Sequence, residues 1–253
     1  TTVNGMLVSG ATGLTPTVSM AGTYDLLVTN TTNGCTSTAS VQVMNEASAP
    51  MALIANPATL TCTTVQTIID ALASSQGATY NYTWSGPGII GGQGTLQPTV
   101  NAPGVYVLDI VNTANGCTDT ETITVPQDIV APVALAGPDG LINCTTPAGS
   151  VGSASNPSGA NFILQWTTVG GNFTSGTNGP TATIDAAGTY TLLITNTTNG
   201  CTDTDDVVVT DDFVAPTIDA GPTFQLTCTQ TSTVLQGTGS TGANFTYQWT
   251  TVS

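Results

Sequence analysis

Residues 188–201 read GTYTLLITNTTNGC, and this stretch decides the fold class of the chain. Apolar side chains fall on every second position from Tyr190 to Ile194, which is the period of a strand with one buried face. An Asn-Gly pair ends the turn that follows and suits a backbone with positive φ. Because Val207 and Val209 alternate beyond the turn, the stretch predicts a β-hairpin.

The same phrase occurs twice more, as GTYDLLVTNTTNGC at residues 22–35 and as a looser copy at residues 104–117. Each copy ends on a cysteine. The chain has six cysteines, and the short spacing between neighbours alternates with one about twice as long: Cys35, Cys62, Cys117, Cys144, Cys201 and Cys228. Trp84, Trp166 and Trp249 follow every second cysteine at nearly the same spacing. A repeat of about 83 residues is a small domain rather than a turn of a solenoid.

Two joints that share the tripeptide Val-Ala-Pro, at residues 129–132 and 213–216, divide the repeats. We therefore expect the C-terminal half of a domain at residues 1–48, complete domains at 49–130 and 131–214, and the N-terminal half of a domain at 215–253.

The two half-domains have complementary content, and the tripeptide Thr-Thr-Val at residues 1–3 recurs at residues 250–252. Two interpretations follow. The sequence is a window of a longer chain, or the last half of one subunit is completed by the first half of the next, as in donor-strand complementation. Both give an unbranched, head-to-tail array.

The composition excludes many functions. The chain has no Lys, Arg or His and 15 acidic residues, for a net charge of −15. Such a chain is repelled by nucleic acid and by anionic membrane surfaces. Ser-His-Asp and Cys-His catalytic sites, Schiff-base lysines and His-ligated zinc all need residues that are missing. Because these residues are missing, we expect no enzyme activity. No apolar run reaches the roughly 18 residues of a membrane span, so we expect no membrane insertion in this segment.

Short alternating strands separated by Gly, Asn and Pro turns are typical of an all-β sandwich. A further strand is predicted around each tryptophan, as at residues 162–166 and 245–249. A tryptophan at a fixed place in each sandwich repeat favours a core position over a sugar-stacking one.

On the phrase at residues 188–201, the tryptophan strand and the Ala-Pro joint, the chain resembles immunoglobulin-like repeats, of the PKD type and related β-sandwich kinds, found in long bacterial cell-surface proteins. The resemblance implies an all-β array of tandem immunoglobulin-like domains with a structural or adhesive role. In antibody domains the corner tyrosine lies almost directly before the second cysteine, whereas Tyr190 and Cys201 lie near opposite ends of the phrase. The tyrosine corner and the usual bridge of those domains are therefore not expected.

Paired cysteines without His favour disulfides, and disulfides indicate an oxidising, extracellular location. We expect one bridge per domain, Cys62–Cys117 and Cys144–Cys201. The alternative pairs neighbouring cysteines across a joint, and it is disfavoured because Cys117 and Cys144 flank the joint that should hold them in separate domains. Cys35 and Cys228 would meet each other only where two half-domains combine.

The acids gather around the joints, where carboxylates suit Ca²⁺. The alternative is a solvated edge charge that discourages aggregation. No cofactor is required, but calcium is a hypothesis for these residues: Glu46, Asp119, Glu121, Asp128, Asp139, Asp203, Asp205, Asp206, Asp211, Asp212 and Asp219.

Five asparagines begin N-glycosylation sequons and are candidate sites, although such triplets arise readily by chance in a chain rich in Asn and Thr. They are Asn30, Asn81, Asn172, Asn196 and Asn244, with a less favoured one at Asn143 beside a cysteine.

The sequence thus predicts a structural subunit or segment of an extracellular filament or stalk, whose partner is another copy of itself. A surface adhesin or glycan-binding module is the alternative, and a carboxylate hydrolase is a distant third.

Overall fold

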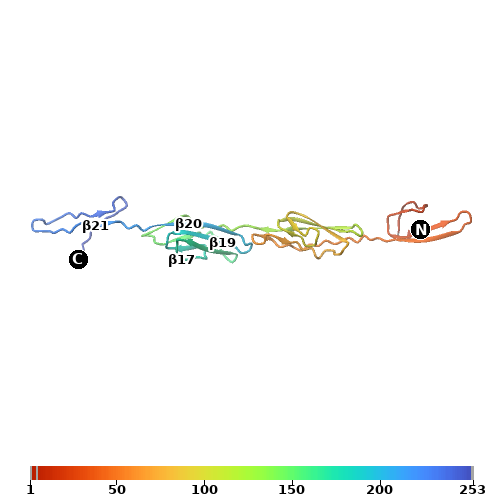
Figure 1. The fold of residues 1–253 in the computed structure, drawn as a ribbon, viewed down its shortest axis with the longest axis horizontal. Helices are drawn as coiled ribbons and strands as arrows, with labels where there is room; N and C mark the ends of the chain where they lie inside the picture. The colour runs from red at the N-terminus through yellow and green to blue at the C-terminus, as the bar shows by residue number, and fades with distance from the viewer. Residues whose placement is uncertain (1, 4, 252–253) are drawn as a thin grey trace. The chain divides into compact units, whose positions relative to one another are not determined.

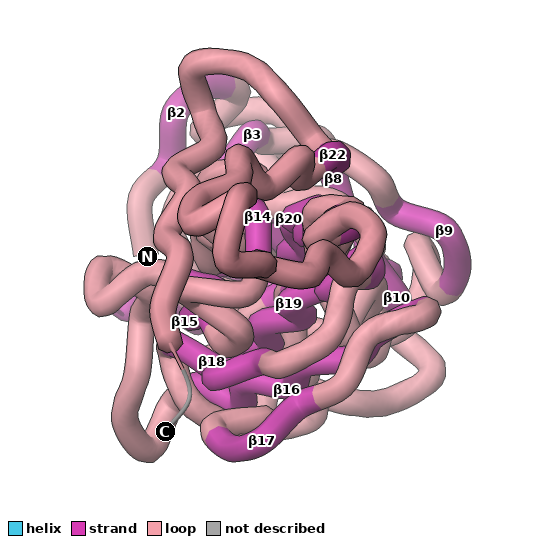
Figure 2. Tube along the Cα trace, turned by 90° about the vertical axis from the view of Figure 1, so that its left-hand side faces the viewer, coloured by secondary structure: helices cyan, strands magenta, loops and turns pink. Residues whose placement is uncertain are grey.

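The computed structural model describes residues 2–3 and 5–251 and divides into two compact units, Thr1–Ile129 and Val130–Ser253. None of the described residues is helical, and the trace consists of strands and loops (Figure 2). Each unit contains one complete sandwich with its own core and one partial sandwich.

The first unit contains strands β1 (Thr2–Val3), β2 (Leu7–Ser9), β3 (Thr17–Val18), β4 (Gly22–Thr29), β5 (Thr36–Val43), β6 (Leu60–Thr61), β7 (Thr67–Ile68), β8 (Tyr80–Ser85), β9 (Ile89–Gly91), β10 (Thr99–Val100), β11 (Gly104–Asn112), β12 (Thr118–Val125) and β13 (Gln127–Asp128). The second contains β14 (Gly140–Asn143), β15 (Gly149–Gly152), β16 (Phe162–Val169), β17 (Phe173–Ser175), β18 (Thr181–Ile184), β19 (Gly188–Asn196), β20 (Thr202–Asp212), β21 (Ile218–Asp219) and β22 (Thr238–Gly239).

The complete sandwich of the second unit packs two sheets, ordered β14-β20-β19-β16 and β15-β18-β17. Strands β19 and β20 run side by side as the central hairpin (Figure 1). Strand β14 pairs with β20 in parallel, and the other pairs are antiparallel. The core between the sheets contains Trp166, Tyr190, Leu192 and Ile194, all at most 4% exposed.

The complete sandwich of the first unit repeats this plan with sheets β12-β11-β8 and β7-β10-β9, and β6 pairs with β13 in parallel. Its core contains Trp84, Tyr106, Leu108 and Ile110, each 0% exposed. The prediction of an all-β fold made of tandem immunoglobulin-like β-sandwiches is confirmed. Trp84 and Trp166 lie in the core as predicted, whereas the same prediction for Trp249 is wrong, because Trp249 is 58% exposed.

The predicted hairpin at residues 190–209 is confirmed by β19 and β20. Tyr190 lies opposite Val207, and the N–H of Asn196 donates to the carbonyl of Cys201 at 2.8 Å to close the turn. Gly200 takes φ of +71°, a conformation that L side chains rarely adopt, which is why the turn ends on Asn-Gly.

The expectation that no tyrosine corner forms is wrong. The Tyr106 hydroxyl donates to the carbonyl of Ala102 at 2.7 Å, and the Tyr190 hydroxyl donates to that of Ala186 at 2.5 Å, in each case four residues upstream. This contact depends on the backbone of the corner before β11 and β19, and the distance in sequence to a cysteine does not affect it.

The partial sandwiches contain fewer strand pairs. The first partial sandwich contains the sheet β1-β4-β5 and the pair β2-β3, and the described residues after 215 contain only β21-β22. The prediction of a strand at residues 245–249 is wrong. Its equivalent β16 pairs with β19 in the complete sandwich, and residues 215–251 contain no segment equivalent to β19 with which a strand there would pair.

Candidate functional site

The cysteines fall into two positional classes within the repeat. Cys117 and Cys201 directly precede β12 and β20, in the turn of the central hairpin. Cys62 and Cys144 directly follow β6 and β14. Repeat equivalence assigns Cys35 to the first class and Cys228 to the second.

The hairpin turn lies where the chain enters a repeat. The Nδ2 of Asn115 donates to the carbonyls of Glu46 at 2.7 Å and Ser48 at 3.0 Å, in the segment that leads into the first complete sandwich. In the second complete sandwich, the Nδ2 of Asn199 donates to the carbonyl of Val130 at 3.0 Å. We call Cys35, Cys117 and Cys201 the incoming-end cysteines.

The other class lies where the chain leaves the repeat. Thr61, beside Cys62, is paired with Asp128, and Asn143, beside Cys144, is paired with Asp212. We call Cys62, Cys144 and Cys228 the outgoing-end cysteines.

The predicted bridges Cys62–Cys117 and Cys144–Cys201 are wrong, because Cys117 and Cys144 are free thiols. Strand β12 separates the two ends of its sandwich by about 26 Å at roughly 3.3 Å per residue, whereas bonded cysteines need Cα atoms within about 7 Å. Among the described cysteines, Cys62 and Cys201 are disulfide-bonded, and Cys35 and Cys228 are free and exposed.

Several joint acids have a structural role within a repeat. The Asp203 carboxylate accepts the N–H of Ala134 at 2.8 Å, and Asp205 accepts that of Ala136 at 2.7 Å. In the first unit, Asp119 accepts the N–H of Ala52 at 2.7 Å. These bonds hold the segment that opens each complete repeat against the edge of its hairpin.

The described residues contain no group of three or more His, Cys, Asp or Glu side chains placed to hold a metal ion. Asp139 accepts the N–H of Val208 at 2.9 Å, which is again a contact within one sandwich. Glu46, Glu121, Asp206, Asp211, Asp212 and Asp219 are exposed, and Asp128 is half-buried.

The sequon asparagines lie on the surface: Asn30, Asn81, Asn172 and Asn244 are exposed and Asn196 is half-buried. The Nδ2 of Asn172, the atom that a glycan would modify, donates to Asp185 at 2.7 Å. Glycosylation at these positions stays a prediction.

The partial sandwiches expose residues that the complete ones bury. Leu26 and Val28 on β4 are 43% and 51% exposed, although the equivalent Leu108 and Ile110 on β11 are 0% exposed. Trp249 is 58% exposed, whereas Trp84 is 0% exposed.

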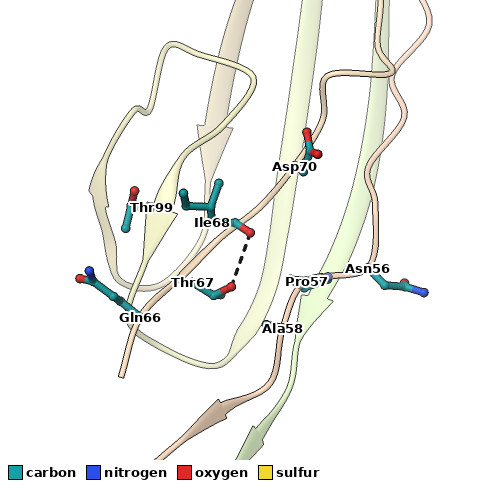
Figure 3. A pocket seen from close by; sticks show the side chains of 8 residues that line it. All are labelled: Asn56, Pro57, Ala58, Gln66, Thr67, Ile68, Asp70 and Thr99. Carbon is teal, nitrogen blue, oxygen red and sulfur yellow. Dashed lines mark hydrogen bonds between the residues drawn. The ribbon is translucent and has the colours of Figure 1, made fainter. Parts of the chain in front are cut away.

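An open groove of about 750 Å³ lies within residues 216–249. Its lining includes Ile218, Leu235, Phe245, Tyr247 and Trp249. A second hollow, of about 480 Å³, lies on the first unit, and its lining has Asp70 as its single carboxylate (Figure 3). Because glycoside hydrolysis needs two carboxylates across a cleft, this second hollow lacks the groups for that reaction.

No family model matches this chain, and the search of curated proteins found no match. Among solved structures, the chain is similar to the immunoglobulin domains 1–5 of Sidekick-1, at 14% identity over 84% of this chain and 50% of that one, with a TM-score of 0.34. It is also similar to the PKD domain of the KIAA 1837 protein, at 17% identity over 36% of this chain and 92% of that one, with a TM-score of 0.25.

A third similar structure is domains 4 and 5 of the S-layer protein SbsC, at 13% identity over 56% of this chain and 79% of that one, with a TM-score of 0.21. These identities and TM-scores are too low to transfer any function. The described residues form no helix long and apolar enough to cross a membrane.

Proposed function

We propose that this chain is a structural module of an extracellular filament or stalk, in which immunoglobulin-like sandwiches are joined head to tail. The observation that carries the proposal is the exposure of Leu26 and Val28, at 43% and 51%, on a strand whose equivalents in both complete repeats are core. Burial of this apolar face is favourable by about 25 cal/mol per Å².

The two partial sandwiches contain complementary parts. Residues 5–48 contain β2, β3, β4 and β5, the equivalents of β17 to β20. Residues 215–251 contain the residues equivalent to β14, β15 and β16. The occupant that we assign to the face of β4 is therefore residues 215–251 of a second copy of this chain.

The complete repeat supplies the expected register. Trp166 lies opposite Leu192 and Leu164 lies opposite Ile194 in the pairing of β16 with β19. Equivalent pairing sets Trp249 of one copy opposite Leu26 of the next. It also sets Tyr247 opposite Val28. In this register β4 of the next copy lies in the groove lined by Phe245, Tyr247 and Trp249.

The function of such an array is mechanical. Asn115 and Asn199 tie the incoming segment of each complete repeat to its hairpin turn, which restrains the joint. The bonded cysteines Cys62 and Cys201 support an oxidising, extracellular location.

The alternative function, a glycan-binding surface module, is favoured by one observation. Phe245, Tyr247 and Trp249 line the open groove together, and aromatic faces stack on sugar rings. In that alternative the groove receives a saccharide instead of a strand.

The test is sedimentation and electron microscopy of the full chain in reducing buffer at increasing concentration, with two variants of β4. We expect the wild-type chain to form extended head-to-tail assemblies and Leu26→Asp to abolish them, because a carboxylate enters the buried face. Leu27→Asp is the matched control, since Asp109 occupies the equivalent position on β11. Wild-type chains that stay monomeric, or equal loss in both variants, would overturn the proposal; glycan binding lost in Trp249→Ala would then support the alternative.

A further inference from the structure

We propose that the two complete sandwiches carry modification sites in their central hairpin turns, at Asn115-Gly116 and Asn199-Gly200. Each asparagine holds the segment that leads into its sandwich, and loses ammonia when that segment detaches from the turn. Conversion to aspartate or isoaspartate removes the N–H donor, so the contact does not re-form. The inference goes beyond the proposed function and concerns contacts within one copy of the chain.

The side-chain amide of Asn199 is held on both sides in the second complete sandwich. Its Oδ1 accepts the N–H of Cys201 at 3.0 Å, and its Nδ2 donates to the carbonyl of Val130 at 3.0 Å. Asn199 is 2% exposed, so water has little access to the amide.

The first complete sandwich repeats the arrangement at Asn115. Its Oδ1 accepts the N–H of Cys117 at 3.0 Å, and its Nδ2 donates to the carbonyls of Glu46 and Ser48. The side chain is half-buried. Because both complete sandwiches make the same contact, it is a property of the repeat and not of one domain.

An Asn-Gly pair is prone to this reaction because glycine has no side chain to hinder the approach of its nitrogen. The glycine nitrogen attacks Cγ of the asparagine, so that an N–Cγ bond forms and the Cγ–Nδ2 bond breaks. The proton of the glycine nitrogen leaves with the amide nitrogen as ammonia. Water then opens the cyclic imide at one carbonyl to aspartate or at the other to isoaspartate. Water is the only co-reactant, and nothing is oxidised or reduced.

The folded turn opposes this reaction at both nitrogens. The N–H of Gly200 donates to the carbonyl of Asn196 at 2.7 Å, and that of Gly116 donates to Asn112 at 2.7 Å. Such a hydrogen bond favours the protonated nitrogen, whereas attack on Cγ requires its deprotonation. The departing Nδ2 is held by a carbonyl of the incoming segment. The reaction therefore needs a local opening in which this segment leaves the turn.

A further Asn-Gly pair in the second complete sandwich, Asn178-Gly179, provides an internal comparison. It lies in the turn between β17 and β18. The N–H of Gly179 donates to the carbonyl of Gly176 at 2.9 Å, so the backbone nitrogen is held as in the hairpin turn. The side chain of Asn178 is exposed, whereas that of Asn199 is buried. The contrast isolates the contribution of the buried amide contact.

Deamidation turns the contact with the incoming segment from attraction to repulsion. A carboxylate has no N–H to donate, and at position 199 it would face the carbonyl oxygen of Val130. Isoaspartate also lengthens the main chain within the turn. The bond from the N–H of Ala134 to Asp203 remains, so the start of the segment loosens while the sandwich stays folded.

The first test follows deamidation of the full chain in mildly alkaline buffer, folded and in guanidinium chloride. The chain lacks Lys and Arg, so chymotrypsin replaces trypsin for peptide mass spectrometry. In the folded chain we expect Asn115 and Asn199 to react at least about tenfold more slowly than Asn178, because their hydrogen bonds must first open. In denaturant we expect similar rates at all three. Equal rates in the folded chain, or a difference that persists in denaturant, would overturn the inference.

The same data separate detachment of the segment from unfolding of the whole sandwich. Local opening costs less free energy than global unfolding. Deamidation of Asn199 in the folded chain should therefore exceed its rate in the unfolded chain multiplied by the unfolded fraction. A rate equal to that product would assign the reaction to unfolded chains and overturn the link to the segment.

A variant tests the link without a change in the turn. Asp203→Ala removes the acceptor of the Ala134 N–H and should accelerate deamidation of Asn199 several-fold, with Asn115 in the other sandwich unchanged. Asp206→Ala is the matched control, because Asp206 is exposed on the same strand. No acceleration in Asp203→Ala, or the same acceleration in the control, would overturn the link.

The consequence of the reaction is tested with Asn199→Asp, which reproduces the aspartate product. We expect faster amide hydrogen exchange at Ala134 than in the wild-type chain, because the incoming segment is held less firmly. Asn178→Asp adds the same charge in the exposed turn and should leave this exchange unchanged. Unchanged exchange in Asn199→Asp, or an equal increase in both variants, would refute the release of the segment.

Discussion

The carboxylate of Asp203 accepts a hydrogen bond from the backbone N–H of Ala134 at 2.8 Å, across 69 residues of sequence. The equivalent pair in the first unit, Asp119 and Ala52, repeats it at 2.7 Å. The acids beside the joints thus include side chains that hold the opening segment of a repeat in place.

Replacement of Asp203 by Ala is expected to destabilise the second complete sandwich by about 1–2 kcal/mol, because the buried N–H of Ala134 loses a charged acceptor. Asp206→Ala is the matched control, since Asp206 lies on the same strand and is exposed. Urea unfolding measures both. Equal effects in the two variants would contradict a specific role for Asp203.

The two tryptophans at equivalent positions should behave differently. Trp166→Ala is expected to cost about 3–5 kcal/mol of unfolding free energy, because Trp166 is 4% exposed in a packed core. Trp249→Ala should leave the unfolding of the monomeric chain nearly unchanged, since Trp249 is 58% exposed, and should weaken assembly. Calorimetry in dilute reducing buffer tests the first effect and sedimentation the second. A large loss of monomer stability in Trp249→Ala would contradict the open-groove assignment.

Burial raises the pKa of the Tyr106 hydroxyl above its usual value of about 10. A raised pKa in the folded state means that the contribution to stability is complete below about pH 10 and is lost as the pH rises through the folded-state pKa. The stability advantage of the wild-type chain over Tyr106→Phe should therefore narrow in alkaline buffer. Urea midpoints of both chains at neutral and alkaline pH measure it, and a constant difference would refute the linkage.

Chelation is expected to leave thermal unfolding unchanged. Asp119, Asp139 and Asp203 already accept backbone N–H groups within their sandwiches, and no metal-binding group of three ligands occurs among the described residues. Melting curves with EDTA and with added Ca²⁺ check this. A transition that rises with calcium and falls with EDTA would contradict this expectation and support the calcium hypothesis for the joint acids.

Local pattern was sufficient for much of the fold. The alternation from Tyr190 to Ile194 and the Asn-Gly turn were enough to predict β19 and the hairpin, because strand period and turn chemistry act over a few residues. Trp84 and Trp166 were predicted as core for the same reason: a large apolar side chain at a fixed place in each repeat is buried when two sheets pack.

Local pattern failed where partners are distant in sequence. The segment at residues 245–249 has the composition of a strand, yet strand formation needs a neighbouring strand to accept its hydrogen bonds, and residues 215–251 contain no equivalent of β19. The tyrosine corner was missed because it depends on the path of the backbone before β11 and β19, which spacing to a cysteine does not report.

The sequence by itself determined the repeat, the all-β class, the hairpin and the exclusion of cationic chemistry, since composition and period decide these properties. Only the tertiary structure decided which end of a sandwich each cysteine occupies. Cys62 and Cys117 belong to the same repeat, but β12 keeps them about 26 Å apart, because an extended strand advances roughly 3.3 Å per residue. Strand direction, which no spacing rule encodes, thus rules out the predicted bridge between Cys62 and Cys117 within one domain.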